Sequence, residues 1–122
     1  MARKGLAVKR FVSPEALLQR NALAWLKVRG ILAWRMALGP VLKAGGRVYA
    51  QNPLRGFPDI AGVCSRTQPG RMWAVEFKST KGRLSKSQEE WLTKLRHAGC
   101  AVRVVRYVGD LEAFFRELGE IQ

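Results

Sequence analysis

Apolar residues follow two spacings along this chain, one typical of helices and one typical of strands. Helical spacing occurs at residues 13–29, 85–98 and 110–118. Extended apolar segments occur at residues 31–38, 58–64, 72–78 and 101–107. The predicted order is therefore helix, strand, strand, strand, helix, strand, helix. Helical crossovers of this kind join parallel strands, so the order indicates an α/β domain with a mixed sheet flanked by helices.

Capping residues mark the ends of the predicted helices. Ser13 and Pro14 suit the N-cap and first position of the first helix, and Gly30 follows its end. Ser85 opens the second helix, where Gln88 three residues later completes a capping box. The last helix is expected to begin at Asp110 as its N-cap, with apolar residues inside the core. These core residues are Leu111, Phe114, Phe115 and Leu118.

One predicted strand carries charges only at its end. Trp73, Val75 and Phe77 alternate along one face, which is apolar. Glu76 and Lys78 share the opposite face, because residues i and i+2 of a strand point the same way. We therefore expect a strand that is buried for most of its length and chemically active at its end.

A second acid belongs to the preceding strand, where Asp59 is the only charge in residues 58–64. Two carboxylates meeting beside Lys78 would repel each other unless a cation joined them, and oxygen ligands of this kind suit Mg²⁺ or Mn²⁺. Each fragment alone has a plainer explanation. An Asp near a strand start is commonly a turn residue, and Glu-x-Lys is commonly a solvated face.

Composition points to a polyanionic partner. Lys and Arg total 22 against 9 Asp and Glu, which gives a net charge of +13 on 122 residues. Such a field attracts nucleic acid first, with ribosomal RNA or an anionic membrane as alternatives. No apolar run of about 18 residues and no signal peptide is present, so we expect a cytoplasmic protein with no membrane partner. The length suits one domain at residues 13–122, preceded by a basic arm at 1–12.

The thiols and the single imidazole offer little chemistry. Cys64 and Cys100 lie among apolar residues, which indicates core positions in a reducing compartment and no disulfide. His97 stands near a helix end just before Gly99, where it suits the helix dipole. One His and two separated Cys do not make the usual zinc ligand set, so carboxylates are left to carry the chemistry.

Three motifs together resemble a known nuclease family. They are GFPDI at residues 56–60, VEFK at 75–78 and GRLSKSQEEWL at 82–92. From about Glu15 to about Leu118 the chain resembles the VRR-Nuc family of the PD-(D/E)XK nuclease superfamily. This resemblance implies a restriction-endonuclease-like α-β-β-β-α-β core with a mixed sheet flanked by helices, plus a C-terminal helix.

The resemblance also implies roles for individual residues. Asp59, Glu76 and Lys78 would be catalytic, with Gln88 facing the site to orient the lysine or a water. One or two Mg²⁺ or Mn²⁺ ions, and no organic cofactor, would be held by Glu15, Asp59, Glu76 and the backbone carbonyl of Phe77. Glu15 has a plainer explanation as an acid in a helix's first turn, and Gln88 has one as part of a capping box.

The expected substrate is DNA. Candidate phosphate contacts are Arg35, Lys43, Arg47, Arg55, Lys81 and Arg83, although each is equally well explained as a solvated surface charge. The Gly-rich segment 39–57, with room for a short strand at 47–49, leads into Asp59 and is expected to lie against the DNA.

Similar stand-alone members of the family act as homodimers on branched DNA such as four-way junctions. The resemblance therefore implies an endodeoxyribonuclease of the Holliday-junction-resolvase type with a role in DNA repair. A flap or single-strand nuclease of the same fold, and a catalytically inactive nucleic-acid-binding module, remain as alternatives.

Overall fold

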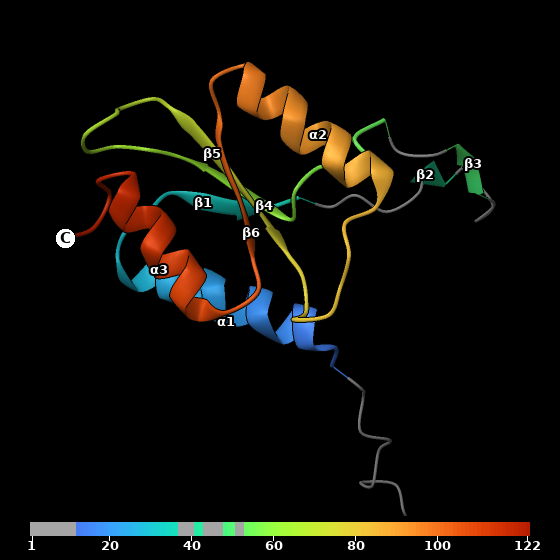
Figure 1. Cartoon of the computed structure of the whole chain (residues 1–122), viewed down its shortest axis with the longest axis horizontal. Helices are drawn as coiled ribbons and strands as arrows, with labels where there is room; N and C mark the ends of the chain where they lie inside the picture. The colour runs from blue at the N-terminus through green and yellow to red at the C-terminus, as the bar shows by residue number, and fades with distance from the viewer. Residues whose placement is uncertain (1–11, 37–40, 43–47, 51–52) are drawn as a thin grey trace, which may run out of the picture.

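The computed structural model describes residues 12–36, 41–42, 48–50 and 53–122 (Figure 1). Its helices are α1 (Pro14–Val28), α2 (Lys86–His97) and α3 (Val108–Glu117). Its strands are β1 (Ala33–Arg35), β2 (Val41–Leu42), β3 (Val48–Ala50), β4 (Ile60–Val63), β5 (Met72–Phe77) and β6 (Ala101–Val105). The predicted basic arm lies almost wholly outside the described residues, and Lys43 and Arg47 lie outside them as well.

A four-stranded mixed sheet forms the centre of the domain, in the order β1-β4-β5-β6. The strand β4 runs antiparallel to β1 and to β5, whereas β6 runs parallel to β5. The helix α2 makes the crossover between β5 and β6 and covers one face of the sheet, while α1 and α3 cover the other (Figure 1). The predicted α/β fold with a mixed sheet, flanking helices and a C-terminal helix is confirmed.

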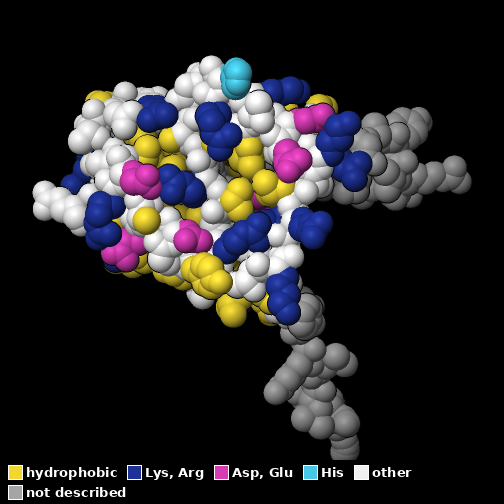
Figure 2. Space-filling model, viewed as in Figure 1, with side chains coloured by type: hydrophobic (Ala, Val, Ile, Leu, Met, Phe, Trp, Pro, Cys, Tyr) yellow, Lys and Arg dark blue, Asp and Glu magenta, His cyan; other side chains and the backbone are white. Residues whose placement is uncertain are grey.

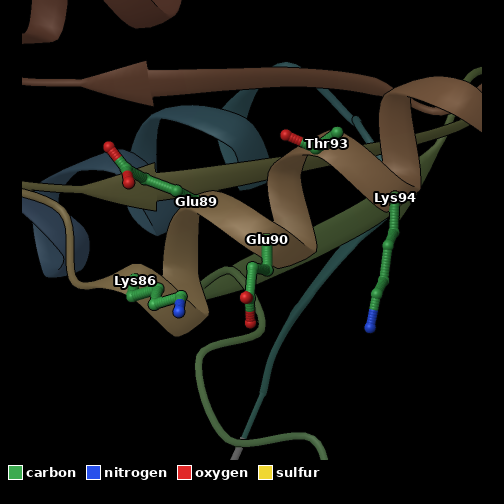
Figure 3. Close-up of a pocket in the computed structure, with 5 residues that line it drawn as sticks. All are labelled: Lys86, Glu89, Glu90, Thr93 and Lys94. Carbon is green, nitrogen blue, oxygen red and sulfur yellow. The ribbon is translucent and has the colours of Figure 1, made fainter.

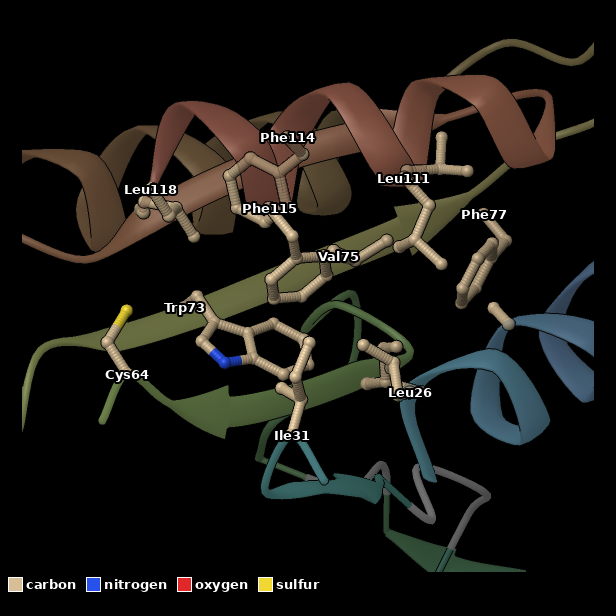
Figure 4. Packing of buried hydrophobic residues seen from close by; sticks show 14 residues of the cluster. Leu26, Ile31, Cys64, Trp73, Val75, Phe77, Leu111, Phe114, Phe115 and Leu118 are labelled. Atoms are coloured by element: carbon tan, nitrogen blue, oxygen red, sulfur yellow. The ribbon is translucent and has the colours of Figure 1, made fainter. Parts of the chain in front are cut away.

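The central strand β5 is buried on both faces. Trp73, Val75 and Phe77 are at most 1% exposed and pack in the larger core against α1 and α3 (Figure 4). Phe115 of α3 meets the Trp73 ring edge-on, with 4.8 Å between ring centroids. Ala74 faces a second core beneath α2. Burial on two sides fixes the direction of the strand and therefore the position of its last residues.

The predicted core residues of the last helix are confirmed. Leu111, Phe114, Phe115 and Leu118 are all buried in the cluster between α3 and β5. Their spacing places them on one stripe of the helix.

The helix ends follow the predicted capping with one correction. Ser13 Oγ accepts the Ala16 N–H at 3.1 Å, and Gly30 takes the positive φ of 70° that suits glycine after a helix. The prediction of Asp110 as an N-cap residue is wrong in position, because α3 begins at Val108 and Tyr107 is its N-cap. The Asp110 carboxylate instead reaches back from the third helical position and accepts the Tyr107 N–H at 3.1 Å.

Several strands are shorter than the sequence predicts. The first predicted strand, 31–38, starts only at Ala33, since the Ile31 N–H bonds back to the α1 carbonyl of Leu26. Residues 37–38 of that prediction lie outside the described residues. Strand β4 begins at Ile60 and not at residue 58. Strand β6 ends at Val105 because the next two backbone N–H groups donate to the Asp110 carboxylate and not to a neighbouring strand.

The small residues of the core also match expectation. Cys64 and Cys100 are free and buried, and burial raises the pKa of both thiols. Gly62 in β4 allows close packing, because a Cβ there would clash with the Leu32 carbonyl and the Trp73 ring. No helix among the described residues is long and apolar enough to cross a membrane.

Candidate active site

Two carboxyl groups meet at one edge of the sheet, where β4 starts and β5 ends. Ile60 pairs with Val75, so Asp59 and Glu76 are the next positions along these antiparallel strands. The Phe77 N–H donates to Asp59 Oδ2 at 2.8 Å and holds the carboxylate in place. Glu76 is only 3% exposed, which is rare for an acid. The predicted meeting of the two acids is therefore seen in the structure.

Burial and proximity change the protonation of this pair. Burial raises the pKa of Glu76 to about 9, and the negative charge of Asp59 and a hydrogen bond to it add to the rise. The pKa of Asp59 is also raised by burial, while the hydrogen bond from Phe77 opposes the rise. Two carboxyls side by side, one buried and one half-buried, cannot both carry a charge at low cost. The two carboxyl groups therefore favour sharing a proton, and the rise in pKa is large at the more deeply buried Glu76.

Lys78 and Glu15 lie close enough to act on both acids. The positive charge of Lys78 lowers the pKa of Asp59 and of Glu76, and the charge of Glu15 raises both. Glu15, in the first turn of α1, accepts the Ser79 N–H at 3.4 Å through its Oε2. Within the described residues, no three His, Cys, Asp or Glu side chains converge as a ready-made metal cluster.

Gln88 connects the second helix to the buried acid. Its Oε1 accepts the Ser85 N–H at 2.8 Å, and its Nε2 donates to Glu76 Oε2 at 3.1 Å. The capping box predicted for α2 is present, with the Gln88 N–H bonded to Ser85 Oγ at 3.2 Å. Gln88 therefore caps the helix and faces the acids at the same time.

Comparison with known families identifies this arrangement. The model of the VRR-NUC domain matches residues 14–108, a range that includes all five residues discussed above, which are Glu15, Asp59, Glu76, Lys78 and Gln88. The chain belongs to the VRR-NUC family. Its members are nucleases, so this protein is a nuclease-family member and a hydrolase in its general class. Comparisons with curated proteins and with solved structures give no match.

The donor set of the VRR-NUC site fits a hard divalent cation. Asp59 and Glu76 present carboxylate oxygens at the same point, and Glu15 lies within electrostatic range of both. The Phe77 peptide lies beside Asp59 through the 2.8 Å bond. Hard cations prefer such oxygen ligands, and a cation and a proton compete for the same carboxylates.

The predicted DNA contacts are spread around this VRR-NUC site. Lys81 and Arg83 are exposed on the turn that follows β5. Arg35 lines a hollow of about 240 Å³ with Gln19 and Arg20 of α1. Arg55 is exposed, and its backbone carbonyl accepts the Trp91 indole N–H at 3.1 Å. Figure 2 shows Lys and Arg side chains across the visible face, with acidic side chains between them.

The sequence analysis missed Arg106. Its Nη1 donates to the carbonyls of Ser79 at 2.6 Å and Gly82 at 2.7 Å, on the turn that follows Lys78. In the sequence Arg106 resembles a solvated charge at a strand end. Its contacts with this turn arise only because β6 pairs with β5, which the local sequence does not show.

A separate cavity of the VRR-NUC domain, of about 500 Å³, lies over α2 (Figure 3). Its lining carries charges of both signs and includes none of the residues predicted for the site. The lining residues are Lys86, Glu89, Glu90, Thr93 and Lys94.

Proposed function

We propose that this protein is a metal-dependent DNA endonuclease that hydrolyses phosphodiesters in branched DNA, in the manner of a Holliday-junction resolvase. The observation that carries the proposal is the pairing of buried Glu76 with half-buried Asp59 beside Lys78 at the end of β5. Burying an acid such as Glu76 costs the fold free energy, and acids with strongly raised pKa values cluster at functional sites.

Each residue has a distinct task in the proposed reaction. Asp59 and Glu76, with Glu15 and the Phe77 carbonyl, would hold Mg²⁺ or Mn²⁺. Bound there, the ion would polarise the scissile phosphodiester and make water more acidic. The Lys78 ammonium would position the attacking water and offset the charge that develops on the phosphate. Gln88 would keep one Glu76 oxygen oriented through its 3.1 Å hydrogen bond.

Substrate choice follows from the charge and from symmetry. A net charge of +13 provides affinity for the DNA backbone without reading bases. A homodimer with two-fold symmetry would present two sites to the two strands of a junction. A cytoplasmic location belongs to the same proposal, since two buried free thiols suit a reducing compartment.

The decisive experiment is cleavage of a labelled panel with Mg²⁺ or Mn²⁺, run beside the Lys78→Ala variant. The panel holds a four-way junction, a flap, a single strand and a plain duplex. Paired incisions in the junction, absent in Lys78→Ala, would establish the proposed activity. Cutting restricted to the flap or single strand would keep a nuclease and replace its substrate. Binding without any cutting by wild type would favour the inactive binding module.

A further inference from the structure

We propose that Arg106 is a positioning residue for the reaction, because it clamps the turn at residues 79–82 against the stem of Lys78. The inference rests on the proposed function, since Lys78 is the group whose placement is at stake. Arg106 immediately follows β6 and is far from Lys78 in sequence. The parallel pairing of Phe77 with Val105 brings the two strand ends together.

The clamp consists of two short hydrogen bonds from one nitrogen. Arg106 Nη1 donates to the Ser79 carbonyl at 2.6 Å and to the Gly82 carbonyl at 2.7 Å. Hydrogen bonds from a charged donor are stronger than neutral ones. Arg106 is half-buried and forms no salt bridge within the described part of the chain, so its interactions here are with backbone groups of the turn. Both ends of the turn are thereby fixed to one side chain.

The backbone of Arg106 is itself held in place. Its N–H donates to Asp110 Oδ2 at 2.9 Å, which ties it to the first turn of α3. The preceding residue, Val105, accepts the Lys78 N–H at 3.1 Å. The backbones of Lys78 and Arg106 are therefore held side by side. The Arg106 guanidinium adds a second connection by bonding to the turn that follows Lys78.

The clamped turn packs directly on the candidate active site. A Cβ at Gly82 would lie 3.3 Å from Glu15 Oε2 and 3.4 Å from Lys78 Cδ, so Gly82 is a near neighbour of both side chains and leaves little room between them. The Ser79 N–H also reaches Glu15 Oε2, at 3.4 Å. Movement of the turn at residues 79–82 would therefore free both the Lys78 stem and the Glu15 side chain to move. Misplacement of a reacting group by about 1 Å costs roughly 100-fold in rate.

The test compares Arg106→Gln with a matched variant at the other end of β5. Arg71 immediately precedes β5, is also half-buried, and donates through Nε to the Gly99 carbonyl at 2.9 Å. Arg106→Gln is expected to lower kcat by about 10- to 100-fold with KM within about threefold, since the misplaced group acts in the transition state. Arg71→Gln is expected to lower thermal stability similarly and to leave kcat within about twofold.

Arg106→Lys provides the rescue. An ammonium has three donors and reaches almost as far, so this variant is expected to recover part of the lost kcat. Two results would overturn the proposal. One is a loss of stability in Arg106→Gln with kcat unchanged, which makes the residue purely structural. The other is a loss confined to DNA affinity, which makes it a phosphate contact.

A readout independent of activity separates this inference from the proposed function. The Gly82 N–H donates to the Ser79 carbonyl at 3.0 Å, so its hydrogen exchange reports on the turn. Amide hydrogen exchange at Lys78 and Gly82 should be at least about tenfold faster in Arg106→Gln than in wild type. In Arg71→Gln it should equal that of wild type. Unchanged exchange in both variants would show that no clamp exists. If wild type cuts no DNA while exchange responds as expected, the proposed function fails and the clamp stands without its catalytic role.

Discussion

The side-chain amide of Gln88 donates a 3.1 Å hydrogen bond to Glu76 Oε2. Its oxygen is occupied by the Ser85 N–H at 2.8 Å, so the amide cannot rotate without losing both bonds. The start of α2 therefore determines the orientation of a buried acid on β5. This connection makes helix capping and the candidate chemistry separable by mutation.

The first prediction concerns Gln88→Ala and its control Ser85→Ala. Both variants remove part of the capping box and should lose about 1 kcal/mol of stability. Only Gln88→Ala removes the donor to Glu76, so only this variant should lower metal-dependent cleavage, by about tenfold or more. Urea unfolding and cleavage rates measure the two effects. Equal cleavage by the two variants would limit Gln88 to its capping role.

A second prediction separates catalysis from DNA binding. Asp59→Ala and Lys78→Ala should abolish cleavage, with losses on the order of 10²- to 10³-fold or more. DNA affinity in EDTA should stay within a few fold, because it comes from the distributed basic surface. Titration of a labelled junction measures the affinity. Cleavage equal to wild type in both variants would remove this site from consideration.

The third prediction concerns pH and the metal-free protein. The pKa of Glu76 is about 9 in the folded protein against an ordinary value of 4.5. The folded state therefore retains a proton that the unfolded chain releases, and stability falls as pH rises between these values. The contribution of the protonated Glu76 carboxyl to the free energy of unfolding is complete below about pH 4.5. It is lost as pH rises through about 9.

Glu76→Gln provides the matching control. Its amide stays neutral at every pH, so thermal unfolding in EDTA should show a flatter pH dependence than in wild type. Near pH 8 the free energy of unfolding of Glu76→Gln should exceed that of wild type by about 1–3 kcal/mol. This difference corresponds to a rise of several degrees in Tm. Parallel Tm curves for the two proteins would contradict the raised pKa. The Asp59 carboxyl, whose pKa is also raised, adds to the wild-type slope.

A fourth prediction tests the packing that supports the site. Gly62→Ala would drive a methyl group into the Leu32 carbonyl and the Trp73 ring, so a loss of more than about 3 kcal/mol is expected. Gly109→Ala, at the second position of α3, meets no heavy atom within 4 Å and should gain about 0.5–1 kcal/mol. Urea unfolding of both variants measures the contrast. Similar values for the two would show that β4 has room to adjust.

Local patterns in the sequence were enough for some parts of the structure. The alternation of Trp73, Val75 and Phe77 predicts a strand with Glu76 at its end, and β5 has that form. Ser85 and Gln88 predict the start of α2 to the residue. In each case the deciding interactions lie within a few residues of one another, so short-range chemistry is sufficient.

Other parts depend on pairings that no local pattern contains. The clamp by Arg106 exists because β6 lies parallel to β5 across the α2 crossover. The late start of β1 follows from the Ile31 bond to Leu26 at the end of α1. Burial of Glu76 follows from helices on both faces of the sheet, and this burial is the largest cause of its raised pKa. Long-range packing decides all three features.

The burial of Glu76 also has an evolutionary meaning. An acid buried near the end of a well-packed strand is a burden for folding alone, since a neutral or apolar side chain of similar size would stabilise the domain. Its presence at a buried position points to a constraint other than stability. Among descendants of this sequence, loss of the acid at this position would mark lineages that kept the scaffold after abandoning its chemistry.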